Sequence, residues 1–322
     1  SENVYKRQVM AGGKKAQENG CDVIVALGGG SVIDAAKAMA VMATNEGDYW
    51  DYIPSGSGKG LPLTNNPLPI VAIPTTSGTG SETDAACVVT NDLTHEKTGF
   101  GHPLLFPSLA IIDPELMLTV LPQFTAYQGF DALFHSIEGY VSNRANPVSD
   151  MYALNAIEHI SRYLPQAVHK GDDLEARSHV ALGSYLSGVV MCVGGVTSQH
   201  SLEHAMSAYH SALPHGAGLI IISKAYFSRM IYRHACDERF IQMARAMGMS
   251  EATIPEDFIT CLERLKQQCN VADITMSAYG ISKEEASVFS TNARETMERL
   301  FMLDRIPLTE SDCIEIYTQS YR

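Results

Sequence analysis

The sequence predicts an α/β domain over residues 1–121, followed by an all-helical domain over residues 122–322. Short apolar runs rich in β-branched residues, each ending in a glycine- or threonine-rich turn, occur in the first part. From about residue 122 onward, apolar residues recur at helical spacing instead. Strands that alternate with helices favour a parallel sheet, whereas helices alone must pack against one another. The change of period therefore marks the predicted domain boundary.

The composition is that of an ordinary globular protein. The 322 residues, of which 45% are hydrophobic, are enough to bury the cores of two domains. The formal net charge of −13 argues against nucleic acid as a partner, because binding phosphates requires clustered lysine and arginine. Seven scattered cysteines without C-x-x-C spacing favour a reducing compartment, and we expect the cytoplasm. No apolar run approaches about eighteen residues and no signal peptide is visible, so we expect no membrane contact.

The chain begins with a predicted helix and strand. Residues 1–20 read as an amphipathic helix that Ser1 or Asn3 caps and Gly20 ends. Residues 23–27 (VIVAL) form a short apolar run, which predicts a fully buried strand.

Three glycines follow this strand, and then a second predicted helix begins. Ser31 is expected to cap this helix, with Asp34 in the capping-box position. A helix N-terminus after a glycine turn presents free N–H groups to an anion, and a pyrophosphate would lie there. The alternative is that the glycines serve packing alone.

A second turn of this kind follows residues 68–74 (LPIVAIP), another predicted buried strand. The turn, TTSGTGSE, offers hydroxyl donors and close backbone approach at the carboxyl end of a strand, where open α/β sheets bind ligands. The alternative is a plain turn in which hydroxyl groups cap the next element.

The remaining elements follow in order. Residues 85–90 and 97–101 flank NDLTHE and predict a β-hairpin, and residues 108–113 (SLAIID) predict a third buried strand that Pro114 ends. Helical periodicity then predicts helices over residues 123–141, 147–164, 174–190, 198–209 and 215–231, with several more up to residue 321.

Four of the eleven histidines lie within the eighteen residues from Gln199 to Gly216. His200 and His204 are four residues apart and share one face of a helix, and His215 lies in a Pro-His-Gly turn. Asp131 and His135 show the same spacing in another helical segment. One carboxylate and several imidazoles are the ligands that Fe²⁺ or Zn²⁺ takes in proteins. The alternative is a solvated helix face, and periodicity does not decide which groups bind.

Four segments, taken together, resemble the iron-containing (group III) alcohol dehydrogenase family. They occur in family order, spread over most of the chain: GGGSVIDAAKAMA, PTTSGTGSE, GFDALFHSIEGYVS and the segment 200–216. The resemblance implies a Rossmann-like dinucleotide-binding α/β domain, incomplete here, followed by an all-α metal-binding domain. This architecture is like that of dehydroquinate synthase.

The resemblance also implies the roles of particular residues. The implied metal ligands are Asp131, His135, His200 and His215. The implied catalytic residue is His204, beside the metal and near the nicotinamide and the substrate. The implied cofactor-binding residues are Gly29, Gly30, Ser31, Asp34, Thr75, Thr76, Thr79 and Lys97. One departure is that the interval from His204 to His215 is a residue longer than in some relatives, which puts the path of the loop in question.

The implied activity is that of a metal-dependent NAD- or NADP-linked alcohol dehydrogenase or aldehyde reductase. The ion, Fe²⁺ or Zn²⁺, would bind the oxygen of a small alcohol and lower its pKa, and hydride would pass to the nicotinamide. A homodimer is expected. Two alternatives stay open: a lyase like dehydroquinate synthase, which uses metal and NAD, and a metal-binding but catalytically idle fragment. Family members have a leading region of some tens of residues that this sequence lacks, so NAD and NADP are not distinguished.

Overall fold

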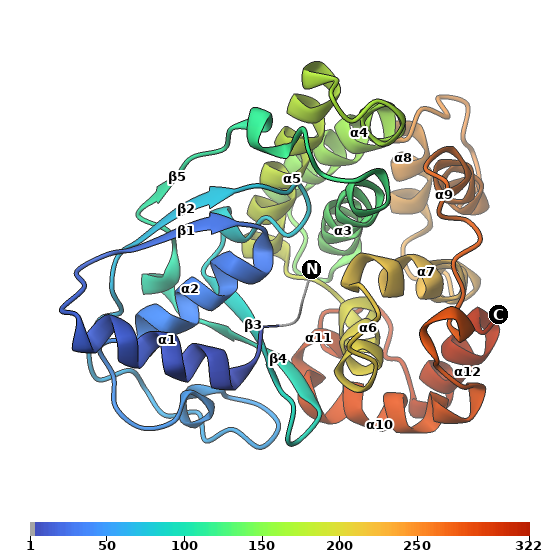
Figure 1. The fold of residues 1–322 in the computed structure, drawn as a ribbon. Helices are drawn as coiled ribbons and strands as arrows, with labels where there is room; N and C mark the ends of the chain where they lie inside the picture. Colours follow the sequence, from blue (N-terminus) through green and yellow to red (C-terminus); the bar gives the residue numbers. More distant parts are fainter. Residues whose placement is uncertain (1–3) are drawn as a thin grey trace.

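A computed structural model describes residues 4–322, and these form two parts. Figure 1 shows the strands with helices α1 and α2 on one side, and helices α3 to α12 on the other. The predicted caps Ser1 and Asn3 lie outside the described residues. The first helix, α1 (Lys6–Glu18), begins after Tyr5 as its N-cap and ends before the left-handed Gly20.

A three-stranded parallel sheet forms one layer of the first part. Its order is β1 (Ile24–Gly28), β2 (Ile70–Pro74) and β5 (Leu109–Ala110). Helix α2 (Gly30–Met42) follows β1 directly and packs against both β1 and β2, and α1 packs against α2. Because all three strands run in the same direction, the turns that follow β1 and β2 meet at one edge of the sheet.

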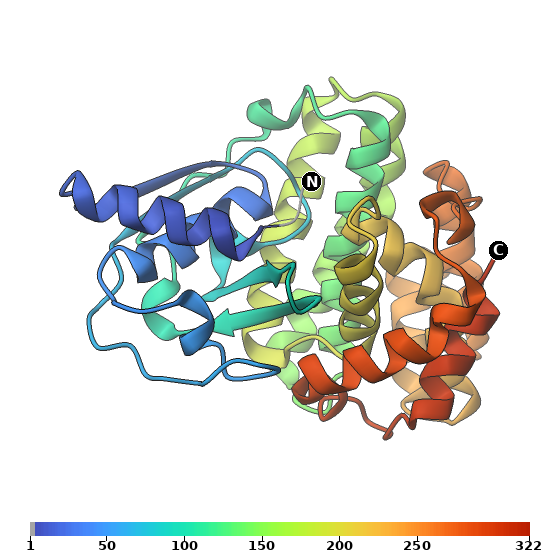
Figure 2. The same cartoon turned by 60° about the horizontal axis from the view of Figure 1, so that its bottom comes forward.

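The predicted hairpin is confirmed. Strands β3 (Ala86–Asn91) and β4 (Glu96–Gly101) pair in antiparallel register, and β3 packs against α2. Helix α2 thus lies between the parallel sheet and the hairpin. Strand β4 contacts α6 and α10 of the helical part, so the hairpin bridges the two parts of the molecule (Figure 2).

The two edge strands are not fully buried, so those two predictions were wrong. Val25 and Leu27 of β1 are 60% and 59% exposed, whereas Ala26 between them is buried. Strand β5 has only two residues, both exposed, in place of the strand predicted over residues 108–113. Helix α2 covers one face of the sheet, and no helix in the described part of the chain covers the other. Alternate side chains point to opposite faces, so an apolar run alone does not show that both are buried.

The predicted cap of α2 is also wrong. The N-cap is Gly29, and Ser31 lies inside the helix without a capping hydrogen bond. Asp34 does not complete a capping box but accepts hydrogen bonds from Ser81 Oγ at 2.6 Å and from the backbone N–H of Val88 at 2.9 Å. Its carboxylate therefore ties α2 to the second turn and to the hairpin.

The second part is helical throughout. The helices with bounds close to the predicted ones are α3 (Pro122–Val141), α4 (Pro147–His169), α5 (Leu174–Gly194), α6 (Ser198–Tyr209) and α7 (His215–Tyr232). The later helices are α8 (Asp237–Ala246), α9 (Glu256–Gln268), α10 (Ala286–Thr296), α11 (Glu298–Phe301) and α12 (Glu310–Ser320). They enclose one large apolar core. All described strands precede α3, and the domain boundary after residue 121 stays a prediction.

No single helix in the described residues is long and apolar enough to cross a membrane. Helices α5 and α6 meet the length and composition criteria only as a pair, and they are bent by 108° relative to each other.

Candidate active site

One cavity of about 430 Å³ is lined by both parts of the molecule. Most residues singled out from the sequence meet on its wall. From the first part these are Gly29, Gly30, Ser31, Asp34, Thr76, Thr79 and Lys97, and from the helical part Asp131, His135, His200, His204 and His215. Thr75 is not on this wall, and its backbone N–H donates to the carbonyl of Gly28. The site therefore lies between the sheet and the helices.

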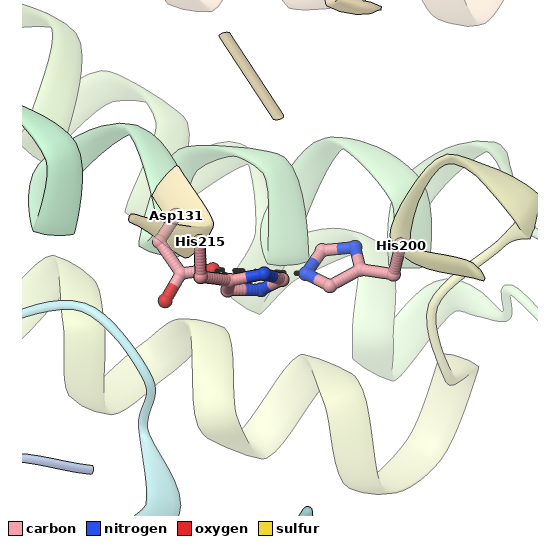
Figure 3. Close-up of side chains that lie close together, drawn as sticks. All are labelled: Asp131, His200 and His215. Carbon is pink, nitrogen blue, oxygen red and sulfur yellow. Dashed lines mark ion pairs between the residues drawn. The ribbon is translucent and has the colours of Figure 1, made fainter. Parts of the chain in front are cut away.

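Three side chains from three helices converge on one point (Figure 3). Asp131 Oδ1 lies 3.6 Å from His200 Nε2 and 3.4 Å from His215 Nε2. Ligand atoms about 2.1 Å from a tetrahedral ion lie about 3.4 Å apart, so this spacing suits one divalent ion. His135 lies beside the group, with Nε2 3.6 Å from Asp131 Oδ1 and its ring stacked on that of His200.

Two of the atoms that face this point form no hydrogen bond within the described part of the chain. Asp131 Oδ1 and His200 Nε2 are buried and form no hydrogen bond. Buried polar atoms without partners are costly, and a bound cation would satisfy both of them. Among the described residues, the side chains of Asp131, His200 and His215 can offer ligand atoms within 4.8 Å of one another. The residues present therefore fit a metal ion.

The opposite nitrogens of two of these histidines are bound by carboxylates that the sequence analysis missed. Glu138 forms a hydrogen bond of 2.6 Å with His200 Nδ1, and Glu203 forms a hydrogen bond with His215 Nδ1. Such partners fix the orientation and the tautomer of a metal-binding histidine. A signal was present, because Glu138 is seven residues after Asp131 and Glu203 is three after His200, on the same helix faces.

The charges of the cluster depend on each other. Burial alone raises the pKa of Asp131, but His135 and His215 hold it well below its usual value. Burial opposes a proton on His200, yet Glu138 and Asp131 raise its pKa to about 10. Burial lowers the pKa of His135 to about 3. The carboxylates therefore favour positive charge at the centre of the group, which a cation would supply.

His204 lies in the cavity next to this group. Its ring centre is 5.1 Å from that of His215, and its Nδ1 contacts Met297 Sδ at 2.9 Å. Burial, followed by the charge of Lys97, holds the pKa of His204 well below its usual value, so the ring is neutral. Glu203, His204 and His215 also form a group with ligand atoms within 4.8 Å.

Lys97 is not a solvated hairpin lysine. It is buried, and its Nζ donates to Ser207 Oγ at 2.9 Å and lies 3.9 Å from Glu203. Because Ser207 and Glu203 belong to α6, Lys97 joins the hairpin to the helix that carries His200 and His204. The hairpin thereby contributes a cation to the cavity wall.

The two glycine- and threonine-rich turns touch each other. A Cβ on Gly30 would lie 2.2 Å from Thr79 Cγ2, and one on Gly29 would lie 3.1 Å from Thr76. Gly30 therefore allows the two turns to pack closely, and whether it serves packing alone stays open. Both turns also line the cavity at the N-terminus of α2, and anion binding there stays a prediction.

A buried lysine that the sequence analysis missed holds these turns in place. Lys37 is fully buried and donates to Ser81 Oγ at 3.0 Å, to Asp84 Oδ1 at 2.7 Å and to the carbonyl of Ala86 at 2.8 Å. It lies three residues after Asp34, so the two side chains share one face of α2. Together they fix α2 to the second turn and to β3.

The chain is similar in sequence to alcohol dehydrogenases over almost its whole length. Residues 1–114 match the family described as iron-containing alcohol dehydrogenase, and residues 125–321 match the C-terminal part of the Fe-containing alcohol dehydrogenase family. The NAD-dependent methanol dehydrogenase of Bacillus methanolicus is 34% identical over 87% of this chain and 72% of its own length. The long-chain-alcohol dehydrogenase 1 of Geobacillus thermodenitrificans is 34% identical over 95% and 76%.

Solved structures agree with these matches. The alcohol dehydrogenase of a halo-thermophilic archaeon from a Red Sea brine pool superposes with a TM-score of 0.94 and 30% sequence identity. The superposition covers 99% of this chain and 82% of that chain. The predicted fold class, an α/β part followed by an all-helical part, is confirmed.

Proposed function

This chain belongs to the iron-containing alcohol dehydrogenase family, and we propose that its cavity holds one divalent ion and NAD while it oxidises a small alcohol or reduces the matching aldehyde. As a member of this family it is an oxidoreductase that acts on CH–OH groups. The observation that supports this use of the cavity most strongly is a pair of opposed walls. One wall carries the cluster of Asp131, His200 and His215, and the other carries the glycine turn at the N-terminus of α2.

The metal would be held by Asp131, His135, His200 and His215. The short spacing of three of these side chains and the unpartnered atoms of Asp131 and His200 support this assignment. We include His135 because its Nε2 lies 3.6 Å from Asp131 Oδ1, which is also the distance of His200 Nε2 from that oxygen. When bound, the ion supplies a Lewis acid for the substrate oxygen and NAD supplies the hydride acceptor.

The nucleotide would lie along the two turns. The proposed contacts are Gly29, Gly30, Ser31, Asp34, Thr75, Thr76, Thr79 and Lys97, of which all but Thr75 line the cavity. Backbone N–H groups at the start of α2 would bind the phosphates. Besides this proposed contact, the carboxylate of Asp34 positions the second turn and the hairpin, because it accepts hydrogen bonds from Ser81 and Val88.

His204 is the residue proposed to move the proton. Oxidation of an alcohol releases one proton in addition to the hydride, and a neutral imidazole in the cavity can accept or relay it. The position of His204 supports this role, because the ring lies beside His215 and faces the cavity without being needed in the first cluster. Met297, which lies between α10 and α11, contacts the ring through its sulfur.

Three finer assignments belong to this proposal. We propose NAD rather than NADP, Fe²⁺ or Zn²⁺ as the metal, and the domain boundary after residue 121. A cytoplasmic homodimer is the proposed form of the enzyme. The scattered free cysteines support a reducing compartment.

The proposal is tested by coupling metal content to NAD reduction. The chain, loaded with Fe²⁺ or Zn²⁺ without oxygen, should reduce one NAD for each molecule of alcohol consumed. Treatment with a chelator should abolish this reaction, and added ion should restore it. A lyase would return its NAD unchanged, so substrate conversion without net NADH would support that alternative instead. NAD reduction at the full rate after complete metal removal would overturn the assignment of the metal site.

A further inference from the structure

Two arginines that form no ion pair with a carboxylate of the described residues lie on the helical wall of the cavity. Arg144 and Arg299 both line it, and both are exposed to it. Within residues 4–322, the side chain of Arg299 forms one hydrogen bond, to the carbonyl of Gly99 at 3.3 Å, although a guanidinium group has five donors. By contrast, Arg239 on α8 has a carboxylate partner, because it donates hydrogen bonds of 2.8 and 2.9 Å to Asp150.

The surroundings of Arg299 favour an anion. The side chain of Arg299 lines the cavity and is exposed, and no carboxylate among the described residues forms an ion pair with it. The chain has 13 more negative than positive charges, so carboxylates are plentiful. The absence of a carboxylate beside Arg299 is therefore a local feature of the cavity. An anionic ligand group would form charge-assisted hydrogen bonds with the remaining donors of Arg299.

Arg299 lies on the helical wall of the cavity, on a helix next to the one that carries His204. Arg299 belongs to α11, which packs against α6, the helix that carries His200 and His204. It lies two residues after Met297, whose sulfur contacts His204. The glycine turns proposed to bind the nucleotide belong to α2 and the parallel sheet, on the opposite wall.

The segment that carries Arg144 is bound to the same wall. The backbone N–H of Asn143 donates to the carbonyl of Leu303 at 2.9 Å, and Arg305 donates to the carbonyls of Val141 and Ser142 at 2.9 Å. The loop after α3 and the segment after α11 therefore form one rigid surface. Apolar side chains lie on this wall as well: Val196, Met297, Leu300 and Leu303.

We propose that the preferred substrate is a short-chain alcohol or aldehyde with a terminal acidic group, such as a hydroxycarboxylate, whose anion binds Arg299 and Arg144. This inference rests on the proposed function of the cavity. The alcohol carbon gives its hydride to NAD⁺ and the hydroxyl gives up its proton, so the acidic group takes no part in the chemistry. It holds the substrate, while the apolar side chains contact the methylenes between the two ends.

The test compares 4-hydroxybutyrate with 1-butanol, which share a four-carbon primary alcohol and differ in the carboxylate. The metal-loaded chain should show a kcat/KM at least about 10-fold higher for the acid, since a charge-assisted bond is worth about 10- to 100-fold. Arg299→Gln should remove this preference, because it should lower kcat/KM for the acid far more than for butanol. Arg144→Gln should reduce it, and Arg162→Gln, on the outer surface of α4, should not change it.

Binding measurements test the anion site without turnover. Calorimetry should show that butyrate binds more tightly than butyramide, and that Arg299→Gln abolishes the difference. Equal binding of the two compounds, or equal effects of Arg299→Gln on both alcohols, overturns the inference. Weaker NADH binding by Arg299→Gln would assign the arginine to the cofactor and would also overturn it. If the chain oxidises neither alcohol, the proposed function fails, and the butyrate comparison still decides whether the anion site exists.

Discussion

At the scale of single residues, the cluster consists of side chains that face one point and of carboxylates that hold these side chains in place. Asp131, His200 and His215 stand out because metal-binding residue types recur at helical spacing. Glu138 and Glu203 are equally close to the chemistry, since each bonds the outward nitrogen of a histidine. Glutamates are common on helices, so these two become distinctive only when the fold buries them.

Lys97 shows that a local sequence pattern does not predict contacts between distant segments. The resemblance implies that Lys97 contacts the cofactor, which stays a prediction, and the fold also buries its side chain against α6. A contact between residues 97 and 207 depends on how two parts of the molecule pack. Local pattern contains no information on such a distance.

The role of His204 can be tested by its replacement with alanine. We expect His204→Ala to keep near-normal metal content and to lower turnover by about 10²- to 10⁴-fold, the usual worth of a positioned acid or base. Metal analysis and steady-state rates of the same preparation provide the measurement. His210→Ala, at the end of the same helix and bonded to Glu285, is the control. If the variant binds little metal, His204 orients a metal ligand. If turnover is unchanged, His204 takes no part in the chemistry.

Glu82 in the second turn gives a test of pH dependence. Burial raises the pKa of Glu82 from 4.5 to about 7. Between these values the folded chain holds a proton that the unfolded chain releases, so stability falls as pH rises through this range. Glu82→Gln removes this loss, and the variant should be more stable than the wild type at pH 8 by on the order of 1–3 kcal/mol and equal to it at pH 4.

Denaturant unfolding at several pH values measures this difference. The exposed Glu115 provides a control, because Glu115→Gln should follow the wild-type curve. If the free energy of unfolding of Glu82→Gln depends on pH in the same way as that of the wild type, the buried carboxyl does not lose its proton as described.

At the scale of elements, the type and order of helices and strands followed from local pattern, whereas burial did not. The hairpin and helices α3 to α7 lie close to their predicted ranges. The cap of α2 was wrong because Asp34 finds partners in Ser81 and Val88, which are distant in the sequence. A capping box is a local bond, and a tertiary contact with the same carboxylate replaces it here.

The turn before α2 is the element whose function is most open to test. In Gly30→Ala, the new methyl group would meet Thr79, so the two turns must separate. We expect weaker NAD(H) binding with the metal retained, measured by calorimetry and metal analysis. Gly101→Ala, whose Cβ would make only ordinary contacts of 3.8 Å or more, is the control. Unchanged nucleotide affinity would mean that the glycines of this turn serve packing alone.

At the scale of the whole molecule, the cavity exists because three long-range arrangements coincide. The parallel strands bring two turns to one edge, the hairpin joins α2 to α6, and α3, α6 and α7 bring their polar faces together. The sequence predicted each group of residues separately. It could not predict that α11 and the loop after α3 close the same cavity with two arginines, because neither segment has a distinctive pattern.

The central claim is that Asp131, His135, His200 and His215 hold one divalent ion in this cavity. Elemental analysis of protein reconstituted with Fe²⁺ or Zn²⁺ without oxygen tests it most directly, in parallel for the wild type and for His215→Ala. We predict about one ion per wild-type chain and a small fraction of this in the variant, with NAD(H) binding retained in both. A wild-type chain that binds no stoichiometric ion, or a variant that binds as much as the wild type, would contradict the account.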